Sequence, residues 1–458
     1  MLRIVTSAAG IGVNHTLDIS RLEAALTSRD VAALSSGLAT LLPHDPDASR
    51  AGELVRFVLG GPRPERPFSG TAAIFLESLA RTRRLVESGR PDPSPQNRML
   101  IGRDLDFIGA VKGIPAWTIP QCLNFLLLSQ IRPTRRAALV GTMRDDGIYA
   151  LEWIAYHLAL GFEHIFIYTN DNSDGSDQLL RILANHKIIT LMESETSKKV
   201  APEAKAYEHS IHLLHALREF EWILYLDSDE YFVPAPRFGN SVANVLAAVG
   251  KKFPDRLPSC VCYSWLWFIS EMAYFRTPGL MIERFQHARP HWITKALVRL
   301  RDVVSMRQEH FPDVKAGGFL VDSAFDVLPF DVKELWKKHQ VQYAGGRINH
   351  YWPKSFEEFA IKKARGQTLQ LDENLYDRPF ELFFTWNGYA SKDNYYPIDT
   401  VVLGRVRETM KKLKQIAGVG ALADQIDREF PTVLDRYYNG GVDLPSLYSR
   451  HKTKPGAL

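Results

Sequence analysis

Acidic residues follow directly on an apolar segment near the middle of the chain. Residues 222–226 read Trp-Ile-Leu-Tyr-Leu, and Asp227, Ser228, Asp229 and Glu230 come next. Several carboxylates at the end of a buried strand are costly unless a cation or hydrogen-bond donors neutralise them. Carboxylate oxygens suit Mg²⁺ or Mn²⁺, which usually keep open positions for substrate phosphates. The spacing therefore favours a metal and diphosphate site over a solvated acidic turn.

A polar loop follows another apolar run earlier in the chain. Residues 169–176 read Thr-Asn-Asp-Asn-Ser-Asp-Gly-Ser. Short polar side chains of this kind can hydrogen-bond a ribose or the edge of a base. An Asx-rich turn that caps the next helix would explain the same residues. Taken alone, the loop favours the capping turn over the nucleoside contact.

A third segment, Asn-His-Tyr-Trp-Pro-Lys-Ser, carries both an imidazole and positive charge. Neutral His350 could complete a metal shell, although taken alone a buried structural histidine is the commoner role. Lys354 and Arg365 could hold a phosphate. Ser355 and Glu358 have the spacing of a capping box, which predicts that a helix begins there.

The segments around these motifs predict an α/β domain. Short apolar runs, read as buried strands, cover 137–143, 164–168, 188–192 and 222–226, and helical periodicity covers 148–160, 176–185 and 202–219. This alternation is typical of a mostly parallel sheet flanked by helices. Ligands of such sheets bind beyond the carboxyl ends of the strands. We therefore expect the loops after Met143, Tyr168 and Leu226 to face one crevice.

The length and the changes in pattern along the chain predict three regions. A chain of 458 residues suggests two or three domains. The first part reads mainly as helices and ends beyond a proline-rich segment at 90–97, and the last part is again mostly helical. We predict a helical N-terminal region over 1–135, the α/β domain over 136–370 and a mostly helical C-terminal extension over 371–458.

Composition and charge exclude several classes of protein. With 45% hydrophobic and 24% charged residues, the chain is an ordinary globular one. Its 3 cysteines suit a reducing compartment, and a net charge of +4 is too small to indicate a nucleic-acid partner. Neither a signal peptide nor a membrane-spanning run is evident, so we expect a cytoplasmic protein. The helical segment at 405–415 is basic on one side, so peripheral contact with the cytoplasmic face of a membrane is the alternative to simple packing.

Residues 137–370 resemble the glycosyltransferase family 2 and family 92-like group. The matching stretches occur in the family's order and read MRDDGIYALEWIAYHLALGFEHIFIYTNDNSDGS, KAYEHS, EWILYLDSDEYF, MIERF, KALVRL and INHYWPKSFEEFAIKKARG. The resemblance implies a GT-A fold and an inverting transferase that uses a nucleotide-sugar donor, with a UDP-sugar favoured. It also implies Mn²⁺ or Mg²⁺ as cofactor, and a saccharide or a lipid-linked acceptor.

The resemblance also implies roles for individual residues. The first-strand loop that meets the nucleotide holds Arg144, Asp145 and Asp146, and the nucleoside loop holds Asn170, Asp171 and Ser173. The helix before the acidic motif begins with Lys205 and Tyr207, and the metal and diphosphate residues are Asp227 and Asp229. The C-terminal site motif is matched by His350 and Lys354, with His310 as an upstream histidine. On this basis we predict Asp227, Asp229 and His350 as metal ligands and Asp229 as part of the catalytic centre. The residues predicted to bind the donor are Arg144, Asp145, Asp146, Asn170, Asp171, Ser173, Lys205 and Lys354.

Inverting transfer also needs a general base for the acceptor hydroxyl. Glu271 follows an expected strand at 261–265, in the region that should face the acceptor, and Asp326 is a second candidate. An exposed loop position would explain Glu271 equally well. The nearby Trp265 and Trp267 could stack on a sugar ring, although aromatic clusters are more often core.

Two other functions remain open from the sequence. A metal-dependent nucleotidyltransferase also places carboxylates at strand ends, but it needs a loop rich in glycine and lysine near the first strand, and Arg-Asp-Asp-Gly is not one. A nucleotide-sugar-binding scaffold without catalysis would bind the donor but show no turnover.

Overall fold

The chain folds around one large mixed sheet. The computed structural model describes residues 19–66, 68, 72–89, 96–110, 117–197, 200–308, 310–329, 341–366, 379–389, 392–438 and 441–452. Along the sheet the strands are β1 (Arg98–Ile101), β4 (Thr190–Ser194), β3 (His164–Thr169), β2 (Arg135–Met143), β5 (Phe220–Asp227), β8 (His287–Arg299), β7 (Cys260–Ile269), β11 (Leu320–Asp322) and β12 (Val327–Leu328). A further strand, β13 (Gly346–His350), pairs with β7 and with β6 (Glu230–Pro234). Strands β9 (Val303–Gln308) and β10 (Phe311–Val314) form a separate pair.

The half of the sheet from β1 to β5 is parallel throughout. Beyond it, β8 runs antiparallel to both β5 and β7. Strand order along the sheet is 4-3-2-5, so the connection reverses direction between β2 and β5. The carboxyl ends of these two neighbours lie together, with Thr142 paired to Asp227. In open α/β sheets such a switch point is where ligands bind.

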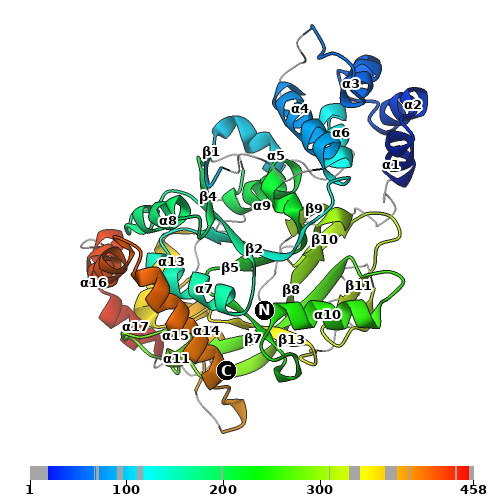
Figure 1. Ribbon diagram of the computed structural model, residues 1–458. Helices are drawn as coiled ribbons and strands as arrows, with labels where there is room; N and C mark the ends of the chain where they lie inside the picture. Colours follow the sequence, from blue (N-terminus) through cyan, green and yellow to red (C-terminus); the bar gives the residue numbers. More distant parts are fainter. Residues whose placement is uncertain are drawn as a thin grey trace.

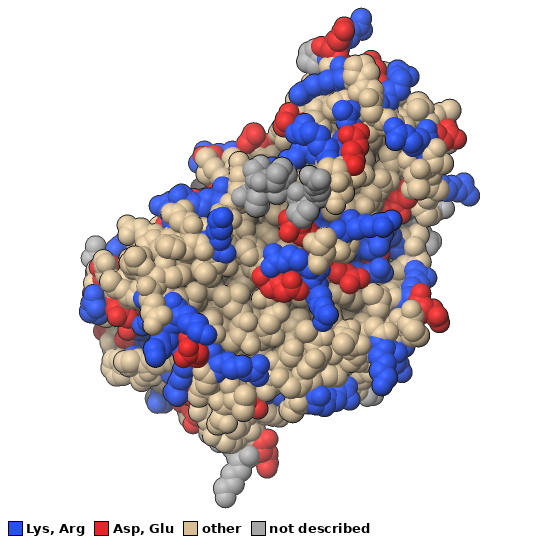
Figure 2. Space-filling view, viewed as in Figure 1, with Lys and Arg blue, Asp and Glu red and all other residues tan. Residues whose placement is uncertain are grey.

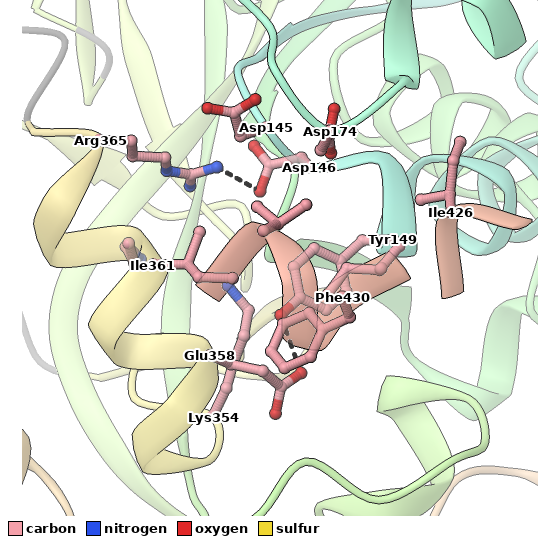
Figure 3. Close-up of a pocket in the computed structure, with 13 residues that line it drawn as sticks. Asp145, Asp146, Tyr149, Asp174, Lys354, Glu358, Ile361, Arg365, Ile426 and Phe430 are labelled. Atoms are coloured by element: carbon pink, nitrogen blue, oxygen red, sulfur yellow. Dashed lines mark hydrogen bonds and ion pairs between the residues drawn. The ribbon is translucent and has the colours of Figure 1, made fainter. Parts of the chain in front are cut away.

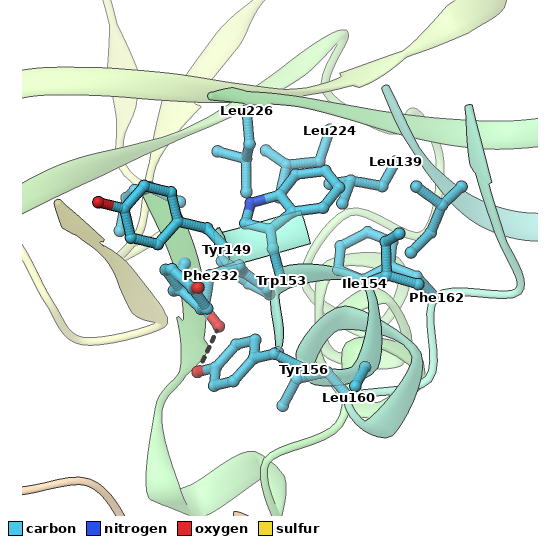
Figure 4. Packing of buried hydrophobic residues seen from close by; sticks show 14 of the residues in the cluster. Leu139, Tyr149, Trp153, Ile154, Tyr156, Leu160, Phe162, Leu224, Leu226 and Phe232 are labelled. Atoms are coloured by element: carbon cyan, nitrogen blue, oxygen red, sulfur yellow. Dashed lines mark hydrogen bonds between the residues drawn. The ribbon is translucent and has the colours of Figure 1, made fainter. Parts of the chain in front are cut away.

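Helices cover both faces of the parallel half (Figure 1). On one face lie α7 (Gly147–Ala159), α8 (Ser176–Asn185), α15 (Thr400–Lys414) and α16 (Val419–Tyr438). On the other lie α5 (Asp106–Ala110) and α9 (Pro202–His212). Because successive strand residues point to opposite faces, Leu139 and Leu224 pack under α7 whereas Val140 and Tyr225 pack towards α9. Figure 4 shows Trp153 and Ile154 of α7 on Leu139, Leu224 and Leu226. Burial on both faces explains why these strands are almost wholly apolar.

The N-terminal region is helical, as the sequence predicts, and it docks on the α9 face. Its helices are α1 (Ile19–Thr27), α2 (Val31–Leu41), α3 (Ala51–Val58), α4 (Ala72–Ser88) and α6 (Ile119–Leu128). Every residue of α6 is buried, and Asn124 within it accepts a hydrogen bond from Ser78 Oγ (2.9 Å) and donates one to the His212 carbonyl (2.6 Å). The same region supplies β1, which extends the sheet beside β4. The predicted boundary at 135 therefore follows, rather than precedes, one strand of the sheet.

The remaining helices are α10 (Val242–Lys252), α11 (Met281–Arg284), α13 (Phe356–Ala364), α14 (Glu381–Trp386) and α17 (Leu444–Lys452). In the described part of the chain, no helix is both long and apolar enough to cross a membrane. The basic segment at 405–415 belongs to α15, which buries Val402, Val406 and Leu413 and leaves Lys411 and Lys412 exposed. On the face shown in Figure 2, Lys and Arg side chains are interspersed with Asp and Glu. The predicted class, a mainly parallel α/β sheet between helical terminal regions, is confirmed.

Candidate functional site

Asp229 is a buried carboxylate at the switch point, and two lysines and a histidine contact it. Lys354 Nζ lies 3.0 Å from its Oδ2, and Lys362 Nζ contacts the same oxygen. His350 Nε2 lies 3.5 Å from Oδ1. Burial alone would raise the pKa of Asp229, but the two ammonium groups and His350 hold that pKa well below its usual range. Asp229 is therefore a buried anion at neutral pH.

A third lysine neutralises the rest of the acidic motif. The buried Lys295, from β8, lies 3.3 Å from Asp227 Oδ2 and 3.2 Å from Glu230 Oε2. Glu230 also accepts a hydrogen bond from the backbone N–H of Asp227 (3.1 Å). The side chain of Asp227 keeps 32% of its surface exposed, whereas that of Asp229 keeps 4%. Asp227 is thus the carboxylate of the motif that faces solvent.

Two neighbouring segments bring the cations to Asp229. Strand β13 carries His350 alongside β7, and the N–H of Tyr351 donates to the Asp229 carbonyl (2.9 Å), which pins the end of β13 to the acidic loop. Helix α13 then begins at the capping box of Ser355 and Glu358, as the sequence predicts. Lys354 precedes this cap with a left-handed φ of 53°.

Helix α13 is held in place by a buried ion pair. Arg284 Nη2 lies 2.6 Å from Glu358 Oε1, and the Tyr149 hydroxyl donates to the same oxygen (2.8 Å). Burial tends to raise the pKa of Glu358, but Arg284 and its hydrogen bonds lower it to about 2. Lys362 and Arg365 lie four and seven positions after Glu358, on the same side of the helix. From this side of the helix Lys362 reaches Asp229, and Arg365 reaches Asp146, as Figure 3 shows for Arg365.

The loop after β2 meets α13 through Arg365. Its Nη1 lies 2.6 Å from Asp146 Oδ1 and also donates to the Arg144 carbonyl. Burial would lower the pKa of Arg365, but Asp146 outweighs it and raises that pKa. Arg144 thus contributes its backbone to this contact, while its Nε is buried without a hydrogen-bond partner.

Asp145 joins the loops that follow β2 and β3. Its backbone N–H donates to Asn172 Oδ1 (2.8 Å), and its Oδ1 accepts from the N–H of Ser173 (2.5 Å). The two residues before Asn172 make other contacts. Asp171 is exposed and accepts a hydrogen bond from Thr196 Oγ1 (2.6 Å), and Asn170 hydrogen-bonds Asp171 (3.1 Å). Of the three predicted nucleoside-loop residues, Ser173 is the one joined to the β2 loop.

Lys205 lies apart from this cluster. Its buried Nζ contacts the Gly102 carbonyl (2.8 Å), Asp106 Oδ1 (2.8 Å) and the Glu195 carbonyl (2.9 Å). These contacts tie α9 to the segment after β1. That Lys205 binds the donor stays a prediction, and Tyr207, on the same helix, is buried in the core.

The candidate bases also lie apart from Asp229. Glu271 has 48% of its side chain exposed and lies 2.8 Å from His287 Nδ1. Asp326 is exposed in the turn between β11 and β12. Neither contacts the lysine cluster of Lys295, Lys354 and Lys362 in any described interaction, so the assignment of a general base stays a prediction.

An aromatic wall of Trp265 and Trp267 borders His350. The ring centroids of Trp265 and Trp267 lie 4.3 and 5.0 Å from that of His350. Both tryptophans are nearly buried, at 6% and 5% exposure. His310 packs edge-on against Trp265, with centroids 5.4 Å apart. Trp265 Nε1 is buried without a hydrogen-bond partner, and His350 Nδ1 lies 3.9 Å from Glu230 Oε1.

Comparison with known proteins finds a family match in the middle of the chain. Residues 148–375 match the family model of glycosyltransferase family 92. This central domain is glycosyltransferase family 92-like. A family 92 protein of Ricinus communis is 33% identical over 92 residues, which make up 20% of this chain and 16% of that relative. The resemblance noted in the sequence is confirmed, and the match spans a small part of the relative's length.

Solved structures of S. aureus TarS are also similar to part of the chain. One matches with a TM-score of 0.23 and 11% identity, covering 68% of this chain and 46% of TarS. TarS 1–349 in complex with UDP matches with a TM-score of 0.23 and 13% identity, covering 67% of this chain and 92% of that one. At TM-scores this low, the similarity to TarS supports no statement about the function of the family 92-like domain.

The predicted metal ligands do not form a coordination shell among the described residues. Across the described ranges, no three His, Cys, Asp or Glu side chains are placed to hold one ion. Asp229, the central predicted ligand, is instead contacted by Lys354 and Lys362. A requirement for Mn²⁺ or Mg²⁺ stays a prediction, with Asp227, Asp229 and His350 as the residues that would hold the ion.

Sequence reasoning missed two lysines of the family 92-like site. Lys362 was detectable, because it shares a face of the predicted helix with Arg365 and follows the capping box. Lys295 was not, since it lies within an apolar strand and reaches the acidic motif only because β8 pairs with β5.

Proposed function

We propose that this chain transfers a sugar from a nucleotide-sugar donor to a hydroxyl of a saccharide or lipid-linked acceptor, with inversion at the anomeric carbon. A UDP-sugar is the first donor to test. The observation that supports the proposal most is the convergence of Lys354 and Lys362 on Asp229, at the edge where β2 and β5 end. The family 92-like character of the same residues supports it independently.

The lysine cluster matches the charge that such a reaction develops. When the acceptor oxygen bonds to the anomeric carbon, the bond to the diphosphate breaks and its electron pair stays on the phosphate oxygen. Preorganised cations in a buried site stabilise this developing charge strongly. An ammonium group has three N–H donors. Lys354 gives one to Asp229, which leaves two for phosphate oxygens.

The acceptor proton must leave in the same displacement. Glu271 is the residue that we propose as base, because it is a half-exposed carboxylate that follows β7 directly. The sugar of the acceptor would then approach from the side of β7, the strand that carries Trp265 and Trp267.

Nucleotide binding is the first test. Thermal unfolding of the full chain would be followed with UDP, GDP and their common sugar conjugates, each with Mn²⁺ or with a chelator. A ligand at about 100 times its Kd stabilises a protein by roughly 2.7 kcal/mol, a readable shift. We expect a shift with one nucleotide and a larger one with Mn²⁺. Well-folded protein that shifts with none of them would overturn the proposal.

The Asp227→Asn variant separates the metal from the lysines. Asp227 is partly exposed, so the protein should tolerate the change. If Asp227 holds the ion, the variant loses the Mn²⁺-dependent part of the shift and keeps the part measured with chelator. Equal shifts with Mn²⁺ and with chelator in the wild type would mean that Lys354 and Lys362 alone carry the diphosphate charge.

Turnover separates an enzyme from a scaffold. Release of free nucleotide diphosphate from the bound donor, accelerated by an added saccharide, supports the transferase. Binding without release in any acceptor mixture supports the nucleotide-sugar-binding scaffold, and release of pyrophosphate from a nucleoside triphosphate supports the nucleotidyltransferase.

A further inference from the structure

Helix α16 lies beyond the family 92-like segment, yet it covers the loops of the candidate donor site. The family match ends at residue 375, and α16 begins at Val419. Ile426 lies against the start of α7, where a Cβ added at Gly147 would come within 3.0 Å of it. It also lies beside Gly175, whose φ of 86° is a glycine conformation. The helix therefore packs directly on the beginnings of both helices that follow the nucleotide loops.

The end of α16 hydrogen-bonds both loops. The Tyr437 hydroxyl donates to Asp145 Oδ2, the oxygen that Ser173 does not use. Burial first, and then Asp145, raise the pKa of Tyr437 to about 12, so the phenol is a donor at neutral pH. Arg436 Nη1 donates to the Ser173 carbonyl (2.5 Å). One end of one helix thus holds the loop after β2 and the loop after β3 together.

The middle of α16 forms a wall of the cavity that contains the cations. Ile426, Phe430 and Val433 line it from α16 (Figure 3), and Asp146, Tyr149, Lys354, Lys362 and Arg365 line it from the family 92-like domain. The cavity is apolar on the α16 side, and on the other side it is lined by carboxylates such as Asp145 and Asp146 as well as by the cations. Helix α16 therefore closes the space beside the two loops.

We propose that α16 is part of the donor site and that Tyr437 and Arg436 are positioning residues that set donor affinity by fixing the two loops. This inference rests on the proposed function, because it assigns the donor to the same crevice. It places a determinant of donor binding in the C-terminal extension, outside the segment that resembles the family.

The test compares two adjacent tyrosines of α16 in the full chain. Tyr437→Phe removes the hydrogen bond to Asp145, whereas the control Tyr438→Phe removes a hydrogen bond to the Ala360 carbonyl (2.7 Å) on α13. Calorimetric titration with UDP and with GDP gives the Kd, and steady-state kinetics give the donor KM and kcat. We expect Tyr437→Phe to raise the Kd and the donor KM about tenfold, equivalent to about 1.4 kcal/mol, with kcat within about twofold. Tyr438→Phe should leave all three near the wild-type values.

A surface variant keeps the test valid if Tyr437→Phe folds poorly. Arg436 is exposed, so Arg436→Ala should not disturb folding, and it should raise the Kd by about threefold while Arg436→Lys restores part of the affinity. Nucleotide Kd values that are unchanged in both Tyr437→Phe and Arg436→Ala would overturn the inference. Wild-type protein that binds no nucleotide would instead overturn the proposed function, so the two failures are distinguishable.

Discussion

Arg365 and Asp146 form a buried ion pair that joins α13 to the loop after β2, with Nη1 and Oδ1 2.6 Å apart. The two residues are distant in the sequence and belong to the two elements that border the crevice. Their side chains keep 13% and 4% of their surface exposed. The pair therefore holds the cation-bearing helix against the sheet edge where the acidic motif ends.

Breaking this pair should destabilise the fold. Removing one partner leaves an uncompensated buried charge, which typically costs about 3–5 kcal/mol. We expect Asp146→Asn to lower the free energy of unfolding by that order, measured by urea denaturation. The exposed pair Arg407 and Glu283 is the control, because Arg407→Ala should cost at most about 1 kcal/mol. Equal costs for the two variants would show that the buried pair contributes no more than the exposed one.

Lys362 should matter for the reaction, and its neighbour Lys363 should not. Lys362 contacts Asp229, whereas Lys363 lies over the ring of Phe380, 5.1 Å from its centroid. Loss of one preorganised donor at a developing charge costs about 10²–10³ in kcat. We expect Lys362→Met to lower kcat/KM by about 100-fold and Lys362→Arg to recover part of it, measured with the donor found in the thermal screen. An equal loss in Lys363→Met would mean that the general charge of α13, rather than its contact with Asp229, decides activity.

Stability should fall in acid because of Glu358. Its pKa is about 2 in the folded protein and about 4.5 as an ordinary carboxyl, so its folded pKa is depressed. The stability that it contributes is present above pH 4.5 and is lost as the pH falls towards 2. We expect urea unfolding to show this loss in the wild type and a flatter pH dependence in Glu358→Gln. The same slope in both proteins would assign the acid sensitivity to other groups.

Glu271 is the most direct test of the catalytic assignment. Its side chain is half exposed, so Glu271→Gln should fold normally. If it is the general base, kcat should fall by about 10²–10⁴ with little change in nucleotide Kd. His287→Asn, which removes the imidazole that lies 2.8 Å from Glu271, is the matched control and should have a smaller effect on kcat. Wild-type kcat in Glu271→Gln would return this residue to an exposed loop position without a role in the reaction.

Local patterns in the sequence determined much of the fold. The alternation of apolar runs and helical segments from 137 to 226 predicted β2 to β5 and the helices between them, because strand and helix periodicities are short-range properties. The capping box at Ser355 predicted the start of α13 for the same reason. The position of Asp227 and Asp229 at the end of a strand also followed from adjacent residues alone.

Tertiary structure alone decided which side chains meet at that strand end. Lys295 reaches the acidic motif through antiparallel pairing of β8, and Tyr437 reaches Asp145 from a helix near the other end of the chain. Conversely, Lys205 is drawn into oxygen contacts near β1 that no local pattern indicates. Such contacts depend on how distant elements pack, and packing is decided by burial over the whole core rather than by the spacing of neighbouring residues. The sequence by itself therefore determined the sheet edge and its acidic motif, and the packing of β8, α13 and α16 decided the cations and loop contacts that surround them.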